Sequence, residues 1–159
     1  MAHYIISLKD RPWEEWRPGV LSRSWSGEVD GASQVRVGEQ IFKPGSGVSE
    51  HFHTYEEHLV IVEGALQLEV DGEKKIVESP ACVIIPPHTN HSFGCAGETP
   101  VRLYGALGAP IHETFFTAFP EGEAIREYEA GETGGARRRV KVDPATRTAT
   151  DVTATDVNE

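Results

Sequence analysis

The chain has 159 residues, a length that suits one domain with a hydrophobic core of its own. Its 25 acidic and 15 basic residues give a net charge of −10, which disfavours nucleic acids and membrane surfaces as partners because both are polyanionic. Two cysteines are too few for a disulfide framework, and no apolar run approaches the roughly 20 residues that span a bilayer.

The N-terminal segment, residues 1–32, is expected to pack on the domain that follows it. A short strand is predicted at 4–8, whereas residues 11–20 are expected to be irregular because Pro12 and Pro18 interrupt them. Acidic residues and tryptophans follow the first apolar run closely. This is not the pattern of a signal peptide, so we expect a cytoplasmic protein.

Short strands separated by regular turn signals fill residues 33–108. Period-two alternation and short apolar runs predict these strands at 33–43, 48–54, 58–63, 66–70, 73–78, 81–85, 91–95 and 101–107. The dipeptide Asp71-Gly72 between two alternating runs is a strong signal for a two-residue hairpin. About eight short strands of this kind indicate an antiparallel sandwich or barrel.

Helix is expected only in the segment 109–131, with one or two turns at 111–118 and a helix at 121–130. The second stretch has acidic residues at its start and Gly131 just past its end, the usual polarity of a helix. Residues 132–159 are rich in Thr, Asp and Ala and are predicted to form a polar tail.

One stretch of the predicted barrel carries side chains that suit a transition metal. His51 and His53 lie two residues apart on a strand, so they point to the same face, about 6.6 Å apart. Glu57 follows a turn where the chain doubles back, and His91 opens a strand after the turn at 86–90. Three imidazoles and one carboxylate leave two positions open on a six-coordinate ion, as a catalytic metal requires.

The pattern Gly45-(five)-His51-Phe52-His53-(three)-Glu57-(six)-Gly64 resembles the first motif of the cupin superfamily at every fixed position. The second cupin motif is matched by Pro86 and His91. Other residues replace its two glycines and its asparagine, namely Pro80, His88 and Cys95. The resemblance covers residues 33–108. It implies an all-β, RmlC-like double-stranded β-helix (jelly-roll) barrel, a homodimer, and the metal ligands His51, His53, Glu57 and His91.

Other chemically active side chains receive structural interpretations. Glu56 and His58 are expected to face solvent. His88 is expected to be a turn residue, because histidine is enriched at positive φ, with a proton-transfer group at the pocket mouth as the alternative. The other histidines are expected at the surface and the tryptophans outside the barrel: His3, His112, Trp13, Trp16 and Trp25.

The two cysteines are expected to face each other across a hairpin. If Pro86 pairs with His91, paired positions sum to 177, which places Cys82 opposite Cys95. Free cysteine is usually a small buried hydrophobe, and a redox pair or an extra soft ligand is the alternative.

Ligation by three histidines and a glutamate suits one divalent Fe(II), Mn(II), Zn(II), Ni(II) or Cu(II) ion rather than magnesium or calcium. The apolar runs at 58–62 and 81–85 suggest a mostly apolar pocket, which favours iron and O₂. Our first hypothesis is an Fe(II) dioxygenase acting on a small oxygen-bearing molecule, with Glu57 and His88 as catalytic residues. The alternatives are a redox-neutral zinc, manganese or nickel lyase, isomerase or decarboxylase, and a jelly roll that binds a small ligand without turnover.

Overall fold

The computed structural model describes residues 5–117, 123–128, 137–143, 145–146 and 148–151. Within these ranges the chain is nearly all β-structure, with two short 3-10 helices at Leu8–Asp10 and Glu28–Asp30. The strands in chain order are β1 (Glu14–Arg17), β2 (Val20–Ser26), β3 (Arg36–Phe42), β4 (Gly47–Phe52), β5 (Glu57–Glu63), β6 (Ala65–Val70), β7 (Glu73–Glu78), β8 (Ala81–Ile85), β9 (His91–Cys95), β10 (Val101–Leu107), β11 (Glu113–Phe116), β12 (Glu123–Tyr128), β13 (Arg137–Val142) and β14 (Ala149–Asp151). Among the described residues, no helix has the length and apolar character needed to cross a membrane.

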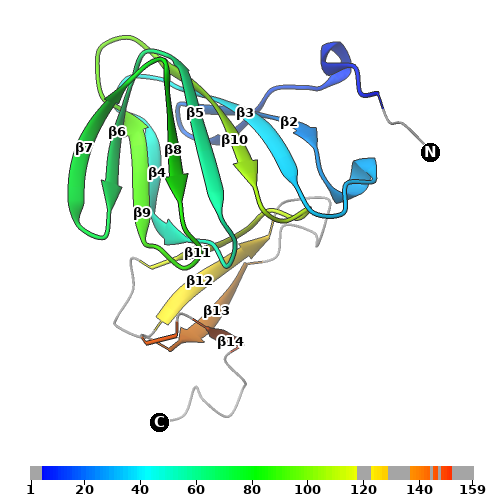
Figure 1. Ribbon diagram of the computed structural model, residues 1–159, viewed down its shortest axis with the longest axis vertical. Coiled ribbons are helices and arrows are strands. Elements are labelled where there is room, and N and C mark those ends of the chain that lie inside the picture. The colour runs from blue at the N-terminus through cyan, green and yellow to red at the C-terminus, as the bar shows by residue number, and fades with distance from the viewer. Residues whose placement is uncertain (1–4, 118–122, 129–136, 144, 147, 152–159) are drawn as a thin grey trace.

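These strands form two antiparallel sheets that face each other as a jelly-roll barrel (Figure 1). One sheet has the order β1-β2-β3-β10-β5-β8, and the other β14-β13-β12-β11-β4-β9-β6-β7. Most consecutive strands of the barrel alternate between the sheets, so that the two inner faces enclose one core. Its buried members are Val20, Phe42, Leu59, Ile61, Leu66, Leu68, Ile85, Phe93, Val101 and Leu103. Burial of each large apolar side chain contributes about 1.5–3 kcal/mol to stability.

The strand predictions for the barrel are confirmed, and its turns show why. Asp71 and Gly72 have φ angles of 45° and 83°, the left-handed geometry that a tight β6–β7 hairpin requires. Gly64 turns the chain from β5 into β6 with φ of 77°. A Cβ atom at this position would lie 2.6 Å from the carbonyl oxygen of Pro100, so only glycine fits the turn.

The prediction of a short C-terminal helix is wrong, because Glu113–Phe116 and Glu123–Tyr128 are strands. The first of them, β11, pairs with β4 and thereby satisfies the backbone groups of an edge that would otherwise stay open. Aromatic and β-branched residues favour this extended structure over a helix. Residues 118, 121–122 and 129–130 of the predicted helices lie outside the described ranges.

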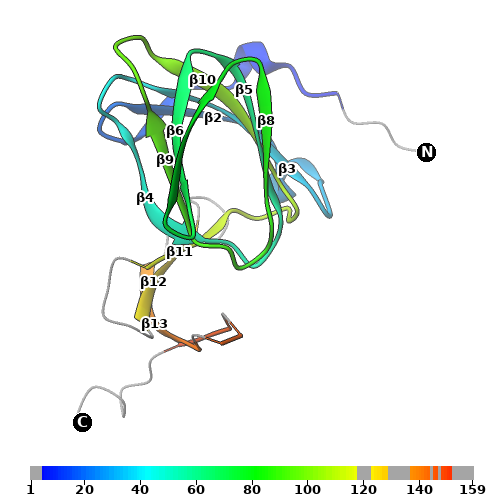
Figure 2. The same ribbon diagram turned by 60° about the vertical axis from the view of Figure 1, so that its left-hand side comes forward.

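The prediction of a polar tail at 132–159 is also wrong where the chain is described, since β13 and β14 continue the sheet beyond β12. These strands lie below the barrel in Figure 2. Val140 and Val142 alternate with basic residues and join a second buried cluster with Phe52, Phe115 and Ala124. Two alternating valines are too short a pattern to predict a strand within an otherwise polar segment.

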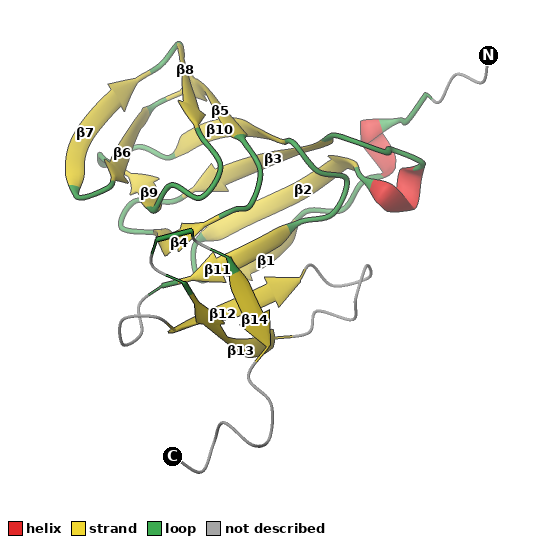
Figure 3. Cartoon of the chain, turned by 60° about the horizontal axis from the view of Figure 1, so that its bottom comes forward, coloured by secondary structure: helices red, strands yellow, loops and turns green. Residues whose placement is uncertain are grey.

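The N-terminal segment forms a hairpin rather than the predicted strand and irregular stretch. Residues 5–7 are not in a strand, residue 4 lies outside the described ranges, and Leu8–Asp10 is a 3-10 helix. The hairpin β1–β2 instead extends the sheet beyond β3 (Figure 3). Pro18 and Gly19 form its turn, with φ of 78° at Gly19, so Pro18 ends a strand instead of disrupting one.

The two cysteines do not face each other, so the predicted pairing is wrong. Cys82 on β8 lies opposite Val60 of β5, whereas Cys95 on β9 lies opposite Leu66 of β6. The connection from β8 to β9 crosses from one sheet to the other and is not a hairpin. Cys82 is exposed, and Cys95 packs against the core as the predicted small hydrophobe.

Candidate metal centre

Four buried side chains converge between the two sheets. His51 is the last but one residue of β4 and His53 follows that strand. Glu57 opens β5, and His91 opens β9, where it lies directly opposite His51. One ligand atom from each of these residues lies within 4.8 Å of the others. All four side chains are buried, with exposed fractions of 6% or less. The convergence predicted from their spacing is confirmed.

Backbone carbonyls set the orientation of all three imidazoles. Nδ1 of His51 lies 2.8 Å from the carbonyl oxygen of Ser49, and Nδ1 of His91 lies 2.9 Å from that of Thr89. Nδ1 of His53 lies 2.6 Å from the carbonyl oxygen of Glu113, on β11. Because a carbonyl only accepts, each Nδ1 carries the proton and each Nε2 presents its lone pair. This is the tautomer that binds a metal through Nε2.

Glu57 completes a set of atoms that needs a cation at its centre. Its Oε2 lies 2.9 Å from Nε2 of His91 and 3.7 Å from Nε2 of His53. With the His91 proton on Nδ1, Nε2 and the carboxylate oxygen are both acceptors, so their close approach needs a shared positive charge: a second proton on Nε2, which makes a hydrogen bond, or a metal ion in its place. A divalent ion supplies that charge, so the residues present fit a metal.

The protonation states suit metal binding as well. Burial raises the pKa of Glu57, but the hydrogen bond to His91 and the charges of His53 and His91 together lower it by a larger amount. The pKa therefore lies below its usual value. Burial, followed by repulsion from the neighbouring imidazoles, lowers the pKa of His51 well below its usual value. Metal ligands must be deprotonated, and these two are so at neutral pH.

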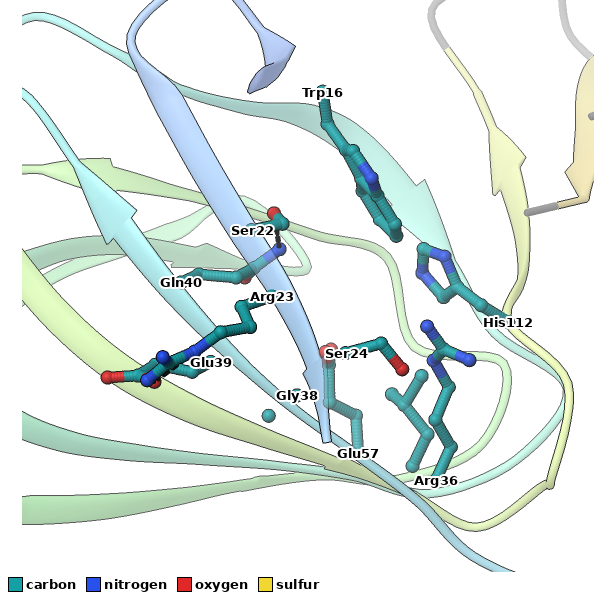
Figure 4. Close-up of a pocket in the computed structure, with 12 residues that line it drawn as sticks. Trp16, Ser22, Arg23, Ser24, Arg36, Gly38, Glu39, Gln40, Glu57 and His112 are labelled. Atoms are coloured by element: carbon teal, nitrogen blue, oxygen red, sulfur yellow. Dashed lines mark hydrogen bonds and ion pairs between the residues drawn. The ribbon is translucent and has the colours of Figure 1, made fainter. Parts of the chain in front are cut away.

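A pocket opens beside Glu57 between β2, β3 and β10, with about 430 Å³ of empty space that is partly open to solvent (Figure 4). It is lined by Trp16, Ser22, Arg23, Ser24, Arg36, Gly38, Glu39, Gln40, Glu57, Gly105, Leu107 and His112. Most of these residues are polar or charged, although apolar atoms contribute as much of the exposed lining, so the pocket wall is mixed and not the mostly apolar one that was predicted. The inward side chains of the two apolar runs, Leu59, Ile61 and Ile85, fill the core instead, while Ile84 is exposed.

His112 and Trp16 have roles that their sequence context did not reveal. Both line the pocket, and their rings stack with centroids 5.1 Å apart, so the predicted surface position of His112 is wrong. Burial, followed by the positive charges of His53, Arg36 and Arg17, lowers the pKa of His112 well below its usual value. Neither residue belongs to a motif, and only the packing of β1 beside the segment before β11 brings them together.

The other predicted positions follow the sequence more closely. Glu56 is exposed and its carboxylate pairs with His58 at 2.8 Å, as expected for side chains that face away from the site. His88 has φ of 62°, as a turn residue should, and its backbone N–H donates to the carbonyl of His53 at 2.7 Å. His88 is not among the residues that line the pocket, so its catalytic role stays a prediction.

Comparison with known proteins agrees with this architecture. A family model described as "Cupin domain" matches residues 38–106. The chain is 30% identical over 104 residues to "Polyketide synthase CurC" of Streptomyces cyaneus, covering 65% of this chain and 68% of that protein. It is 29% identical over 105 residues to "Protein SchB" of Streptomyces halstedii, covering 65% and 76% respectively. The chain therefore belongs to the cupin superfamily.

Solved structures with the same fold are more distant in sequence. The polyketide cyclase RemF from Streptomyces resistomycificus superposes with a TM-score of 0.60 at 20% identity, over 67% of this chain and 79% of that one. KdgF from Halomonas sp. gives a TM-score of 0.58 at 17% identity, over 67% and 94%. The division of this chain at residues 32, 108 and 131 stays a prediction.

Proposed function

We propose that this cupin is a metal-dependent enzyme that acts on a small oxygen-bearing organic molecule. One observation carries the proposal: three buried imidazoles, each held by a carbonyl at Nδ1, and one buried carboxylate gather their free ligand atoms within 4.8 Å. A pocket lined by polar side chains opens at Glu57. Of the candidate ligands His51, His53, Glu57 and His91, Glu57 lines that pocket, so a substrate that enters it would lie beside the candidate metal site.

The reaction class that this site supports best is redox-neutral chemistry at an enolisable carbonyl. The ion would polarise a substrate oxygen as a Lewis acid or, as Fe(II), supply a redox centre for O₂. The polar pocket wall favours the first role because its arginine, serine and glutamine side chains suit a substrate with several oxygens. The relative named as a polyketide synthase and the structural neighbour named as a polyketide cyclase support the same choice.

An Fe(II) dioxygenase is the second candidate, and the aromatic surround of His51 favours it. The ring of His51 lies 5.9 Å from that of Phe93 and 5.7 Å from that of Phe116, so one side of the centre is apolar. These rings exclude water from that side, which protects an oxidising site from side reactions.

Metal loading under controlled atmosphere separates the candidates. Protein purified without chelator is analysed for metal, stripped, reloaded anaerobically with Fe(II), Mn(II), Zn(II) or Ni(II), and supplied with a small β-diketone. Anaerobic turnover with zinc or manganese supports the Lewis-acid role, and oxygen consumption that requires iron supports the dioxygenase. A metal content below about a tenth of an ion per chain after reloading would refute the proposal.

A homodimer and a cytoplasmic location stay predictions. Light scattering tests the homodimer.

A further inference from the structure

Three neighbouring strands carry Arg36, Leu107 and Glu57 in one row. Leu107 of β10 lies directly opposite Arg36 of β3 on one side and opposite Glu57 of β5 on the other. Residues directly opposite in a sheet point to the same face, so Arg36 projects into the barrel like the metal-ligand candidate Glu57. Two strand spacings separate their backbones by about 10 Å. One small molecule can therefore reach both the guanidinium and an ion held by Glu57.

The next row of the same sheet lacks side chains at two adjacent positions. Gly38 of β3 lies opposite Gly105 of β10, and both glycines line the pocket. A Cβ atom at Gly105 would meet no atom within 4 Å, and one at Gly38 would meet only the carbonyl oxygen of Arg23, at 3.4 Å. Neither residue has a positive φ, so their backbone conformation does not require glycine. The two glycines leave a flat recess that side chains would otherwise fill.

The walls of this recess are planar and polar. Trp16 and His112 stack on each other at one side, and Figure 4 shows the guanidinium of Arg36 beside the His112 ring. On the opposite side, the amide of Gln40 donates to the hydroxyl of Ser22 at 3.3 Å. A flat molecule with oxygen substituents matches both walls.

The charge of the recess favours an anion. Arg36 is only 6% exposed, and its guanidinium has five N–H donors, so it can bind an anionic oxygen alongside its contacts within the protein. The two carboxylates that line the pocket are already engaged. Glu39 accepts from Arg23 and Arg102, and Glu57 faces His91 and His53.

We infer that this recess is a substrate subsite in which Arg36 binds the carboxylate or enolate oxygen of a planar, oxygen-rich molecule lying over Gly38 and Gly105. The inference rests on the proposed function, because it places a second oxygen of the same molecule toward the metal centre. It makes Arg36 and Gly105 determinants of substrate specificity that act without binding the metal.

Two probes of equal shape test the charge requirement. Salicylate is planar and anionic with an adjacent hydroxyl group, and salicylamide replaces its carboxylate with a neutral amide. Calorimetric titration of zinc-loaded protein should show salicylate binding at least about tenfold tighter than salicylamide, because a charge-assisted hydrogen bond is stronger than a neutral one. In Arg36→Gln this preference should fall to about one, and Arg36→Lys should retain part of it. Lys75→Gln removes an exposed positive charge on β7 and should leave the preference unchanged.

A second variant tests the recess independently of charge. Gly105→Val places a side chain into the open space and should weaken both probes at least about tenfold, while metal content and thermal stability stay at the wild-type level. Misfolding of Arg36→Gln would appear as a lowered melting temperature of that variant. In that case Gly105→Val still tests the recess. Unchanged affinity for both probes in Gly105→Val would overturn the inference.

The outcomes distinguish this inference from the proposed function. Full metal content with an anion preference that Arg36→Gln does not alter would refute the subsite and leave the metal enzyme standing. Failure to bind metal, together with an Arg36-dependent preference for salicylate in metal-free protein, would refute the proposed function and support the anion subsite.

Discussion

His53 and Tyr55 bind the same backbone carbonyl, that of Glu113 on β11. Nδ1 of His53 lies 2.6 Å from this oxygen and the Tyr55 hydroxyl 2.9 Å, while the two rings stack with centroids 5.2 Å apart. The hydroxyl also accepts from the backbone N–H of Glu113 at 2.8 Å. Burial raises the pKa of Tyr55 above its usual range, so the hydroxyl keeps its proton as a donor. The C-terminal strands thus help to orient a candidate metal ligand of the barrel.

Tyr55→Phe should weaken metal binding without removing a ligand. The stacked ring remains, but the Glu113 N–H loses its acceptor and the carbonyl loses a donor. Loss of such an outer partner costs about tenfold in metal affinity, and the unsatisfied N–H costs about 1–3 kcal/mol of stability. Competition with a chromophoric chelator measures the first effect, and urea denaturation of metal-free protein measures the second. Unchanged affinity would show that the carbonyl alone positions His53.

His91→Ala should abolish stoichiometric metal binding, because it removes one of four ligands at the centre of the cluster. His58→Ala is the matched control, since His58 lies on the outer face of β5 and pairs only with Glu56 among the interactions described. Elemental analysis after reloading should show about one ion per chain in the control and less than about a tenth in His91→Ala. Circular dichroism should show a folded barrel in both. Equal metal content in the two variants would contradict the ligand assignment.

Phe115→Ala should loosen β11 from the barrel. The ring of Phe115 is 2% exposed and stacks on Phe52 with centroids 4.9 Å apart. Truncation of a buried phenylalanine costs about 3–5 kcal/mol, and here it also loosens the strand that carries the Glu113 carbonyl. Relative to the wild type, hydrogen exchange should accelerate more in β11 than in β5, and metal affinity should fall. Ile84→Ala, at a 58% exposed position, should change neither quantity.

Glu39 should make stability depend on pH. Burial raises the pKa of Glu39, but hydrogen bonds and charges from Arg23 and Arg102 together lower it by a larger amount. The folded-state pKa therefore lies below the ordinary 4.5. The folded chain then binds fewer protons than the unfolded chain. Its stabilisation is therefore present above pH 4.5 and is lost as the pH falls through the folded-state value.

Glu39→Gln removes the buried carboxylate charge that pairs with Arg23 and Arg102 and should cost about 2–4 kcal/mol at pH 7. The difference from the wild type should shrink as the pH falls below 4.5. Urea denaturation of both metal-free proteins at several pH values measures it. A difference that is constant with pH would show that Glu39 acts through packing rather than charge.

Local signals were sufficient for the barrel strands and for the four converging side chains. The β8, β9 and β10 boundaries agree with the prediction because Pro and Gly residues mark the turns, and turn geometry depends on only a few neighbouring residues. The convergence of His51, His53 and Glu57 was predictable for the same reason, since strand periodicity and one turn determine it.

The pocket wall was not predictable from β3, because its alternation is misleading. Val37 and Ile41, together with Val35 just before the strand, form the more apolar phase. Val35 is nevertheless 47% exposed, while the opposite phase ends in the fully buried Phe42. Arg36, Gly38 and Gln40 share the phase of Phe42 and face inward. Polar side chains on an inward face destabilise the fold unless partners or a ligand compensate for their desolvation. The sequence of one strand does not show whether such partners are present.

The sequence by itself determined the family, the strands of the barrel and the four side chains of the candidate metal centre, because each depends on periodicity and short spacings. Only the tertiary structure decided which distant segments complete the site. Pairing of β11 with β4 turned an expected helix into the strand that holds His53, and the β1–β2 hairpin brought Trp16 to His112. Such contacts depend on the pairing of strand edges far apart in the chain, whose stability comes from tertiary packing rather than local preference.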